Sequence, residues 1–97
     1  MRLRFEWDLK KEKINQRKHG VSFAEAKSVF LDDEALLIPD PDHSLDEDRF
    51  VLLGMSHKKT RILLVCHCYR ENDQVVRLIS ARKADQQESK EYFSKGD

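Results

Sequence analysis

Arginine and histidine side chains lie in or beside the most apolar stretches of this sequence, where they could act on a phosphate group. Arg49 precedes the run FVLLGM, and His67 lies within ILLVCHCY. Arg77 lies within VVRLIS, and Arg82 follows two residues after that run. An arginine in an apolar strand is costly unless it pairs with a carboxylate or binds a ligand. These residues therefore indicate either structural ion pairs or a site for an anion.

Cleavage of RNA without a metal would require side chains of these types. A ribose 2′-hydroxyl attacks the neighbouring phosphate, and the reaction needs a base, an acid for the leaving 5′-oxygen and fixed positive charge on the transition state. Arg supplies that charge through a planar fork of donors, and His, or less often Glu, transfers protons. The spacing alone does not establish this reaction.

A structural role is the alternative for two of these residues. Arg77 could form a salt bridge to a carboxylate such as Glu47 or Asp48, and His67 could be a hydrogen-bonded interior histidine. Arg82, at a strand end, reaches solvent more readily, which favours a functional role.

The two cysteines do not favour a disulfide or a metal site. Cys66 and Cys68 are two residues apart, so in a strand they share a face at roughly 7 Å, too far for easy disulfide geometry. A metal site would have to recruit His43 or His57, because His67 should point to the opposite face. Gly-rich phosphate loops, the nucleophile elbow and the HExxH motif are all absent from the sequence. We expect free, partly buried thiols, no metal and no cofactor.

Length and composition indicate one domain over residues 1–97, with a net charge of zero. Apolar runs are too short to span a membrane, and the N-terminal residues do not form a signal peptide. We therefore expect a cytoplasmic protein without membrane contact. Lys and Arg outnumber Asp and Glu in residues 1–22 and from residue 49 onward, whereas residues 32–48 are acidic and contain neither Lys nor Arg. A polyanion could meet the two basic ends if they fold together.

The first half of the chain predicts a strand and two helices. Residues 3–7 alternate as a strand, and a helix over 9–18 begins at the N-cap Asp8 and ends at Gly20. Ile14 is its clearest inward position. A second, short helix begins with a capping box formed by Ser22 and Glu25. Its core positions are Phe23, Ala26, Val29 and Phe30.

The second half predicts four strands, over residues 35–38, 49–55, 62–69 and 74–80, with a polar loop over 40–48. The last three are joined by short connections and should pair as an antiparallel meander. A last helix begins at a capping box of Asp85 and Glu88 and runs to about residue 94. The predicted fold class is α+β, an antiparallel sheet with helices on one face, in the order β-α-α-β-β-β-β-α.

Several stretches of the chain together resemble the BrnT family of toxins. They are Phe5-Glu6-Trp7-Asp8, Lys11, Asn15, Lys18-His19-Gly20-Val21-Ser22-Phe23, Asp40-Pro41-Asp42-His43-Ser44, Glu47, Arg49-Phe50, Gly54, Leu64-Val65, His67, Arg77-Leu78-Ile79-Ser80-Ala81-Arg82, Ala84 and Glu88. The resemblance implies a RelE-like fold and a toxin of a bacterial type II toxin–antitoxin pair. It further implies an endoribonuclease that inhibits translation. The implied partners are a ribbon-helix-helix antitoxin, an RNA substrate, and operator DNA only through the toxin–antitoxin complex.

The resemblance also implies the site residues. Arg49 and Arg82 would hold the scissile phosphate, His67 would transfer protons, and Glu47 is the alternative base. The expected catalytic residues are Glu47, Arg49, His67 and Arg82, and the expected RNA-binding residues are Lys18, His19, Arg77 and Lys83. Two other classes stay open: a module that binds RNA or a partner without turnover, and an inactive co-repressor that acts with its antitoxin.

Overall fold

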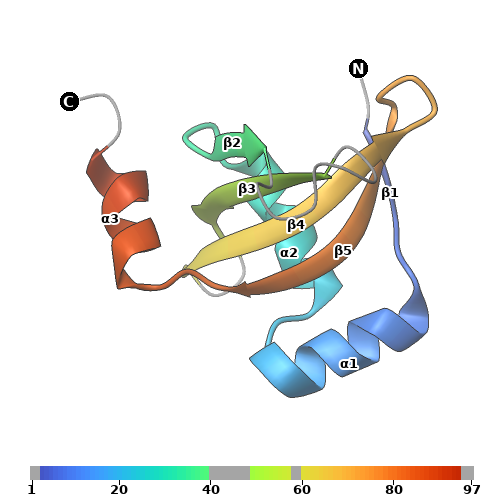
Figure 1. Cartoon of the computed structure of the whole chain (residues 1–97), viewed down its shortest axis with the longest axis horizontal. Helices are drawn as coiled ribbons and strands as arrows, with labels where there is room; N and C mark the ends of the chain where they lie inside the picture. The colour runs from blue at the N-terminus through green and yellow to red at the C-terminus, as the bar shows by residue number, and fades with distance from the viewer. Residues whose placement is uncertain (1–2, 40–48, 58–59, 95–97) are drawn as a thin grey trace.

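The computed structural model describes residues 3–39, 49–57 and 60–94, and its helices and strands follow the predicted order (Figure 1). The helices are α1 (Leu9–His19), α2 (Phe23–Ser28), the short 3-10 helix η1 (Val29–Leu31) and α3 (Gln86–Ser94). The strands are β1 (Arg4–Glu6), β2 (Leu36–Pro39), β3 (Arg49–Met55), β4 (Ile62–Arg70) and β5 (Val75–Lys83). The α+β class is confirmed, while the predicted loop over 40–48 lies outside the described residues. None of the described helices is long and apolar enough to cross a lipid bilayer.

The sheet has the strand order β1-β5-β4-β3-β2. Strands β3, β4 and β5 pair antiparallel, as their short connections predicted, and β2 pairs antiparallel with β3. The prediction of a wholly antiparallel sheet is wrong at β1, which pairs parallel with β5. No hairpin sets the direction of β1, because α1, α2, η1 and three strands intervene between it and β5 along the chain. β5 also continues past its predicted end at Ser80, so Arg82 lies inside the strand.

Helix α1 begins and ends where the sequence indicated. The carboxylate of Asp8 accepts hydrogen bonds from the backbone N–H groups of Lys10 and Lys11, at 2.8 and 3.2 Å. These bonds hold the pKa of Asp8 below its usual value. Gly20 ends the helix with φ +69°, a left-handed conformation that glycine adopts without steric cost.

The inward residue of α1 is Asn15, and the prediction that Ile14 points inward is wrong. Ile14 is 60% exposed, whereas Asn15 is 7% exposed. β1 pairs with β5 only as far as Arg77, so the last half of β5 has no strand beside it on that side. The Asn15 amide takes the place of a strand there. Its Oδ1 accepts from the N–H of Ala81 at 3.0 Å, and its Nδ2 donates to the Ala81 carbonyl at 2.9 Å.

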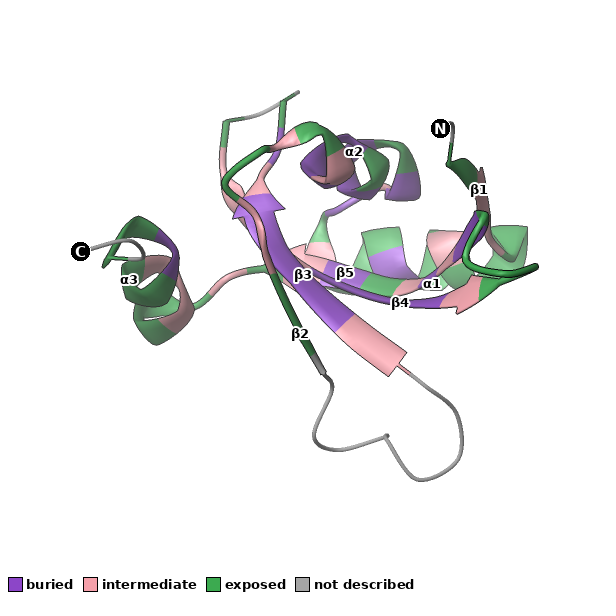
Figure 2. Ribbon diagram, turned by 90° about the horizontal axis from the view of Figure 1, so that it is seen from above, coloured by how far each residue is buried: buried purple, intermediate pink, exposed green. Residues whose placement is uncertain are grey.

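Helices α1 and α2 lie on the same side of the sheet (Figure 2). The Oγ of Ser22 caps α2 by accepting from the Glu25 N–H at 3.0 Å, as predicted. The Glu25 carboxylate pairs with Arg61, at 2.6 and 2.8 Å. The core between these helices and the sheet consists of Val21, Phe23, Ala26, Val29, Leu52, Leu63, Val65, Val76, Leu78 and Ala81. Full burial of one such Val, Leu or Phe contributes roughly 1.5–3 kcal/mol to the free energy of unfolding.

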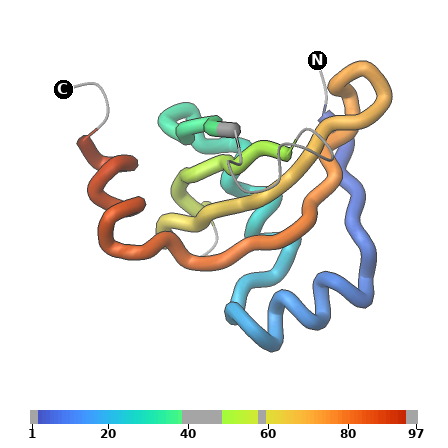
Figure 3. Tube along the Cα trace, in the orientation of Figure 1, coloured from blue at the N-terminus to red at the C-terminus, as the bar shows by residue number. Residues whose placement is uncertain are grey.

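Helix α3 lies beyond the end of β5, apart from α1 and α2 (Figure 3). Both hydrogen bonds of its predicted capping box are present: Glu88 N–H donates to the Asp85 carboxylate at 2.8 Å, and Asp85 N–H donates to the Glu88 carboxylate at 2.9 Å. Near its other end, the Tyr92 hydroxyl donates to Asp32 at 2.6 Å. Burial and this bond raise the pKa of Tyr92 to about 12. The same Asp32 oxygen accepts from the Met55 N–H at 2.8 Å, so one carboxylate joins α3 to β3.

Candidate functional site

Three arginines lie on one face of the sheet, which we call the arginine face: Arg49, Arg77 and Arg82. Arg49 pairs in register with Cys68, and Cys68 with Arg77. Directly paired residues of neighbouring strands point to the same face, so these two arginines flank Cys68, about 10 Å apart at the backbone. Arg82 pairs with Leu64, an even number of residues from Cys68 along β4, and therefore points to the same face.

Glu6 of β1 continues the row of paired residues Arg49, Cys68 and Arg77 across the sheet. Its backbone pairs with Arg77, and its Oε2 accepts a hydrogen bond from the Arg77 guanidinium at 2.7 Å. The Nε of Arg70 lies 3.8 Å from the same oxygen. The carboxylate that the structure shows beside Arg77 is thus Glu6, whereas the sequence pointed to Glu47 or Asp48. Those two residues lie outside the described part of the chain.

Arg82 belongs to the other end of the arginine face. Its partner Leu64 lies four positions before Cys68 in β4, a distance of about 13 Å along the strand. The structure therefore does not bring the backbone of Arg82 beside that of Arg49. The Arg82 guanidinium donates two hydrogen bonds to the Glu88 carboxylate, both of 2.9 Å, and a third to the Lys83 carbonyl at 3.1 Å. Its hydrogen bonds to Glu88 raise the pKa of Arg82 and lower that of Glu88.

His67 lies on the opposite face and is 0% exposed. Its ring packs edge-on against Phe30 of η1, with centroids 5.0 Å apart. Nδ1 lies 3.2 Å from the Val65 carbonyl and Nε2 lies 3.3 Å from the Tyr69 hydroxyl. A carbonyl only accepts, so Nδ1 carries the proton and Nε2 accepts from Tyr69. Burial lowers the pKa of His67, and the interior, hydrogen-bonded alternative is confirmed.

The three expected lysine and histidine contacts lie in two places. Lys18 and His19 line a hollow of about 210 Å³ where the end of α1 meets Ile79 and Ser80 of β5. Ser80 pairs with Cys66 on the arginine face, so this hollow borders that face. Lys83 pairs with Leu63, a core residue, and therefore lies on the helix side of the sheet.

The cysteines are free and buried, on the face opposite His67, as predicted. Among the described residues no three His, Cys, Asp or Glu side chains lie close enough together to hold a metal ion. Of the two loop histidines named above, His43 lies outside the described residues. His57 is exposed, and its backbone N–H donates to Ser28.

Sequence reasoning missed two residues of this site. Glu6 was placed in the first strand, but nothing in the sequence shows that this strand joins β5, which lies about seventy positions later. Tyr69 follows His67 by two residues and so shares its face, a signal that was available in the sequence. Burial and the nearby Asp73 raise the pKa of Tyr69, so its hydroxyl is neutral and can donate.

Comparison with known protein families gives a match. A family model described as the ribonuclease toxin BrnT of type II toxin–antitoxin systems matches residues 7–88. The matched range contains the arginine face from Arg49 to Arg82 and the buried His67. No curated protein matches the chain.

Proposed function

The chain belongs to the BrnT family of ribonuclease toxins of type II toxin–antitoxin systems, and from that premise we propose that it cleaves RNA internally, without a metal. Attack by a ribose 2′-hydroxyl on its own 3′-phosphate is the proposed reaction. Arrest of translation follows from loss of the RNA, and the proposed compartment is the cytoplasm. Residues 1–97 would act as one domain.

The observation that carries this proposal is the arginine face. Arg49 and Arg77 flank the buried Cys68 on the same face of the sheet. We propose that both contact a single phosphate. Arginine stays charged at any working pH and can hold two phosphate oxygens in a plane. Arg82 would contact the RNA backbone further along the same face. Lys18 and His19, at the border of the face, would contribute further backbone contacts, and Lys83 would do so from the other side of the sheet.

Proton transfer is assigned to Glu47 in this proposal. His67, the other candidate, has no exposed surface and lies with Tyr69 on the face of the sheet opposite the arginines. There the Tyr69 hydroxyl donates to Nε2 of His67, a contact that suits a structural role. Glu47, two residues before Arg49 in the sequence, is the proposed general base. A carboxylate is the usual substitute where an imidazole does not reach the substrate.

The proposed antitoxin is a ribbon-helix-helix protein, and operator DNA would bind only to the complex. A net charge of zero is poor for binding a duplex, because affinity for DNA backbone depends on neutralising phosphates with Lys and Arg. In a gel-shift assay the complex should retard operator DNA and the lone chain should not. Equal retardation by the lone chain would contradict this assignment.

A second candidate has a specific observation in its favour. Arg77 and Arg82 both have carboxylate partners within the chain, Glu6 and Glu88, which is what a structural role would require. In that case the chain would serve as a binding module or co-repressor without turnover. Only an activity measurement on the purified chain separates the two.

The test compares Arg77→Ala with Lys90→Ala, a change at an exposed cation of α3. Each protein is incubated with RNA in excess EDTA. We expect the parent and Lys90→Ala to cleave and Arg77→Ala to be slower by about 10²–10³, the cost of losing one preorganised contact to the transition state. Loss of parental activity in EDTA that one divalent ion restores would contradict metal independence. A fully active Arg77→Ala protein would remove the arginine face from the mechanism.

A further inference from the structure

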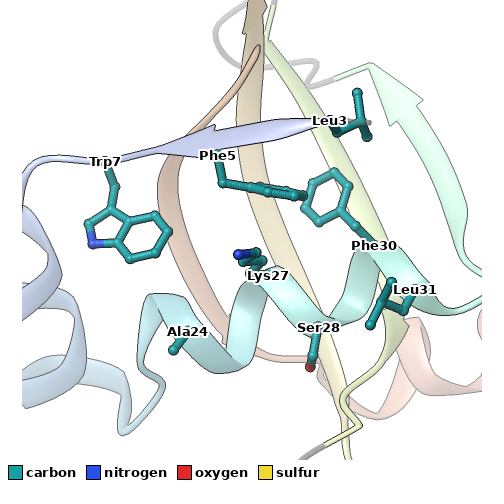
Figure 4. A pocket seen from close by; sticks show the side chains of 8 residues that line it. All are labelled: Leu3, Phe5, Trp7, Ala24, Lys27, Ser28, Phe30 and Leu31. Carbon is teal, nitrogen blue, oxygen red and sulfur yellow. The ribbon is translucent and has the colours of Figure 1, made fainter. Parts of the chain in front are cut away.

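An apolar groove lies between β1 and α2, on the helix side of the sheet (Figure 4). We call it the β1–α2 groove. It has a volume of about 560 Å³. Leu3, Phe5 and Trp7 line it from the β1 side, and Ala24, Phe30 and Leu31 line it from α2 and η1. The Phe5 and Phe30 rings meet edge to face inside it, with centroids 5.1 Å apart.

Two leucines at this groove present their side chains to solvent. Leu31 is 69% exposed and Leu3 is 42% exposed. Exposed leucines beside half-buried aromatic rings form an apolar surface, and its transfer out of water is favourable. Aromatic residues in a well-packed hollow are also the usual anchors of protein–protein interfaces. The groove therefore has the composition of a docking surface.

Lys27 is the charged residue that lines the groove. Its Nζ lies 5.2 Å from the centroid of the Phe5 ring, and among the described residues it forms no ion pair with a carboxylate. An ammonium held over an aromatic ring at the wall of an apolar hollow attracts an anionic group. An occupant of matching chemistry has apolar side chains and one carboxylate placed over Lys27.

RNA does not match this chemistry. The groove offers a single cation, whereas the arginine face offers three on the opposite side of the sheet. A type II toxin has a protein antitoxin that binds it. We propose that the β1–α2 groove binds a segment of the cognate antitoxin, with apolar side chains between Phe5 and Leu31 and an Asp or Glu on Lys27. This inference rests on membership in the family and not on the proposed cleavage mechanism.

A matched pair of leucine substitutions tests the groove. Leu31 and Leu9 are equally exposed, at 69%, but only Leu31 lines the groove. Leu31→Asp should weaken antitoxin binding by at least about tenfold in a titration of the purified chain with its antitoxin, because it puts a carboxylate among the apolar contacts. Leu9→Asp should bind as the parent does. Both variants should cleave RNA at the parental rate.

A charge reversal tests the electrostatic half of the inference. Lys27→Glu should weaken binding, whereas Lys13→Glu, at an exposed position of α1, should not. Changing the acidic residues of the antitoxin to Lys, one at a time, should identify one variant that restores binding to the Lys27→Glu chain. Parental affinity in both Leu31→Asp and Lys27→Glu would overturn the inference. That result would leave the proposed function untouched, since the rate of RNA cleavage is measured separately on the same proteins.

Discussion

The bidentate pair between Arg82 and Glu88 fits two roles for Arg82, as a group that binds phosphate or as a structural contact. Glu88 also accepts a hydrogen bond from the Asp85 N–H, so the same carboxylate starts α3 and holds the guanidinium. The arginine is thereby oriented by a neighbour, as a phosphate-binding group should be. It is also a clamp between β5 and α3. The two roles predict different consequences when the carboxylate alone is removed.

Glu88→Gln removes the ion pair and leaves Arg82 in place, so it is the matched variant for Arg82→Ala. Either change should lower the melting temperature by only a few degrees, because a partly exposed pair contributes about 1 kcal/mol or less. If Arg82 contacts RNA, Arg82→Ala loses growth arrest while Glu88→Gln keeps it. Growth arrest beside a thermal melt for both variants measures this. Equal arrest by the two variants would make Arg82 a clamp alone.

Burial of His67 predicts a dependence of stability on pH. The imidazole titrates near pH 6.5 in the unfolded chain and at a lower pH in the folded one. Between these values the unfolded chain binds more protons, so the free energy of unfolding falls as the pH drops below about 6.5, by at most about 1.4 kcal/mol per pH unit.

Urea unfolding between about pH 5 and pH 7.5 measures this slope. His67→Phe should flatten it, since a phenyl ring fits among Phe30, Phe50 and Tyr69 and does not titrate. His57→Gln, at an exposed position, should keep the parental slope. An unchanged slope in His67→Phe would show that other groups cause the dependence.

At the scale of secondary-structure elements, Asn15 joins α1 to the free edge of β5. Asn15→Ala would leave the N–H and carbonyl of Ala81 buried without a partner, and each such group costs about 1–3 kcal/mol. We expect a loss of roughly 2–4 kcal/mol and faster hydrogen exchange at the Ala81 amide. Gln16→Ala, the exposed neighbour, should change neither quantity by more than about 0.5 kcal/mol. A slow Ala81 amide in Asn15→Ala would show that another group protects this edge.

The elements that the sequence predicted well are those with local causes. Asp8, Ser22 and Asp85 cap helices through groups two or three residues away. Such bonds depend only on residues close together in the sequence. The arginine face was only partly predictable. Strand alternation gives the face of each arginine, but the pairing of Arg77 with Glu6 joins positions about seventy residues apart.

The errors share the same origin. Apolar periodicity predicts that apolar residues point inward, so it indicated Ile14. The inward residue of α1 is the polar Asn15. The parallel pairing of β1 with β5 depends on the path of the whole chain, so no local sequence pattern predicts it. His67 was assigned from its type, whereas its burial depends on the placement of η1 over the sheet.

At the scale of the whole molecule, the sheet separates two surfaces of different chemistry. The arginine face suits a polyanion, and the β1–α2 groove on the helix side suits an apolar partner with a carboxylate. An antitoxin anchored in the groove would leave its remaining segments to cover the arginines. Substitutions in the groove should therefore weaken antitoxin binding and leave RNA cleavage intact.

The central claim is that the chain cleaves RNA by attack of the ribose 2′-hydroxyl, and substitution of that hydroxyl tests it most directly. After a cut site is mapped in EDTA, the same RNA is made with a single 2′-deoxy nucleotide on the 5′ side of the scissile phosphate. We predict that cleavage at this site stops while cleavage at other sites continues, and that the products of the parent RNA carry 5′-hydroxyl ends. Cleavage of the deoxy-substituted site at the parental rate would contradict the mechanism.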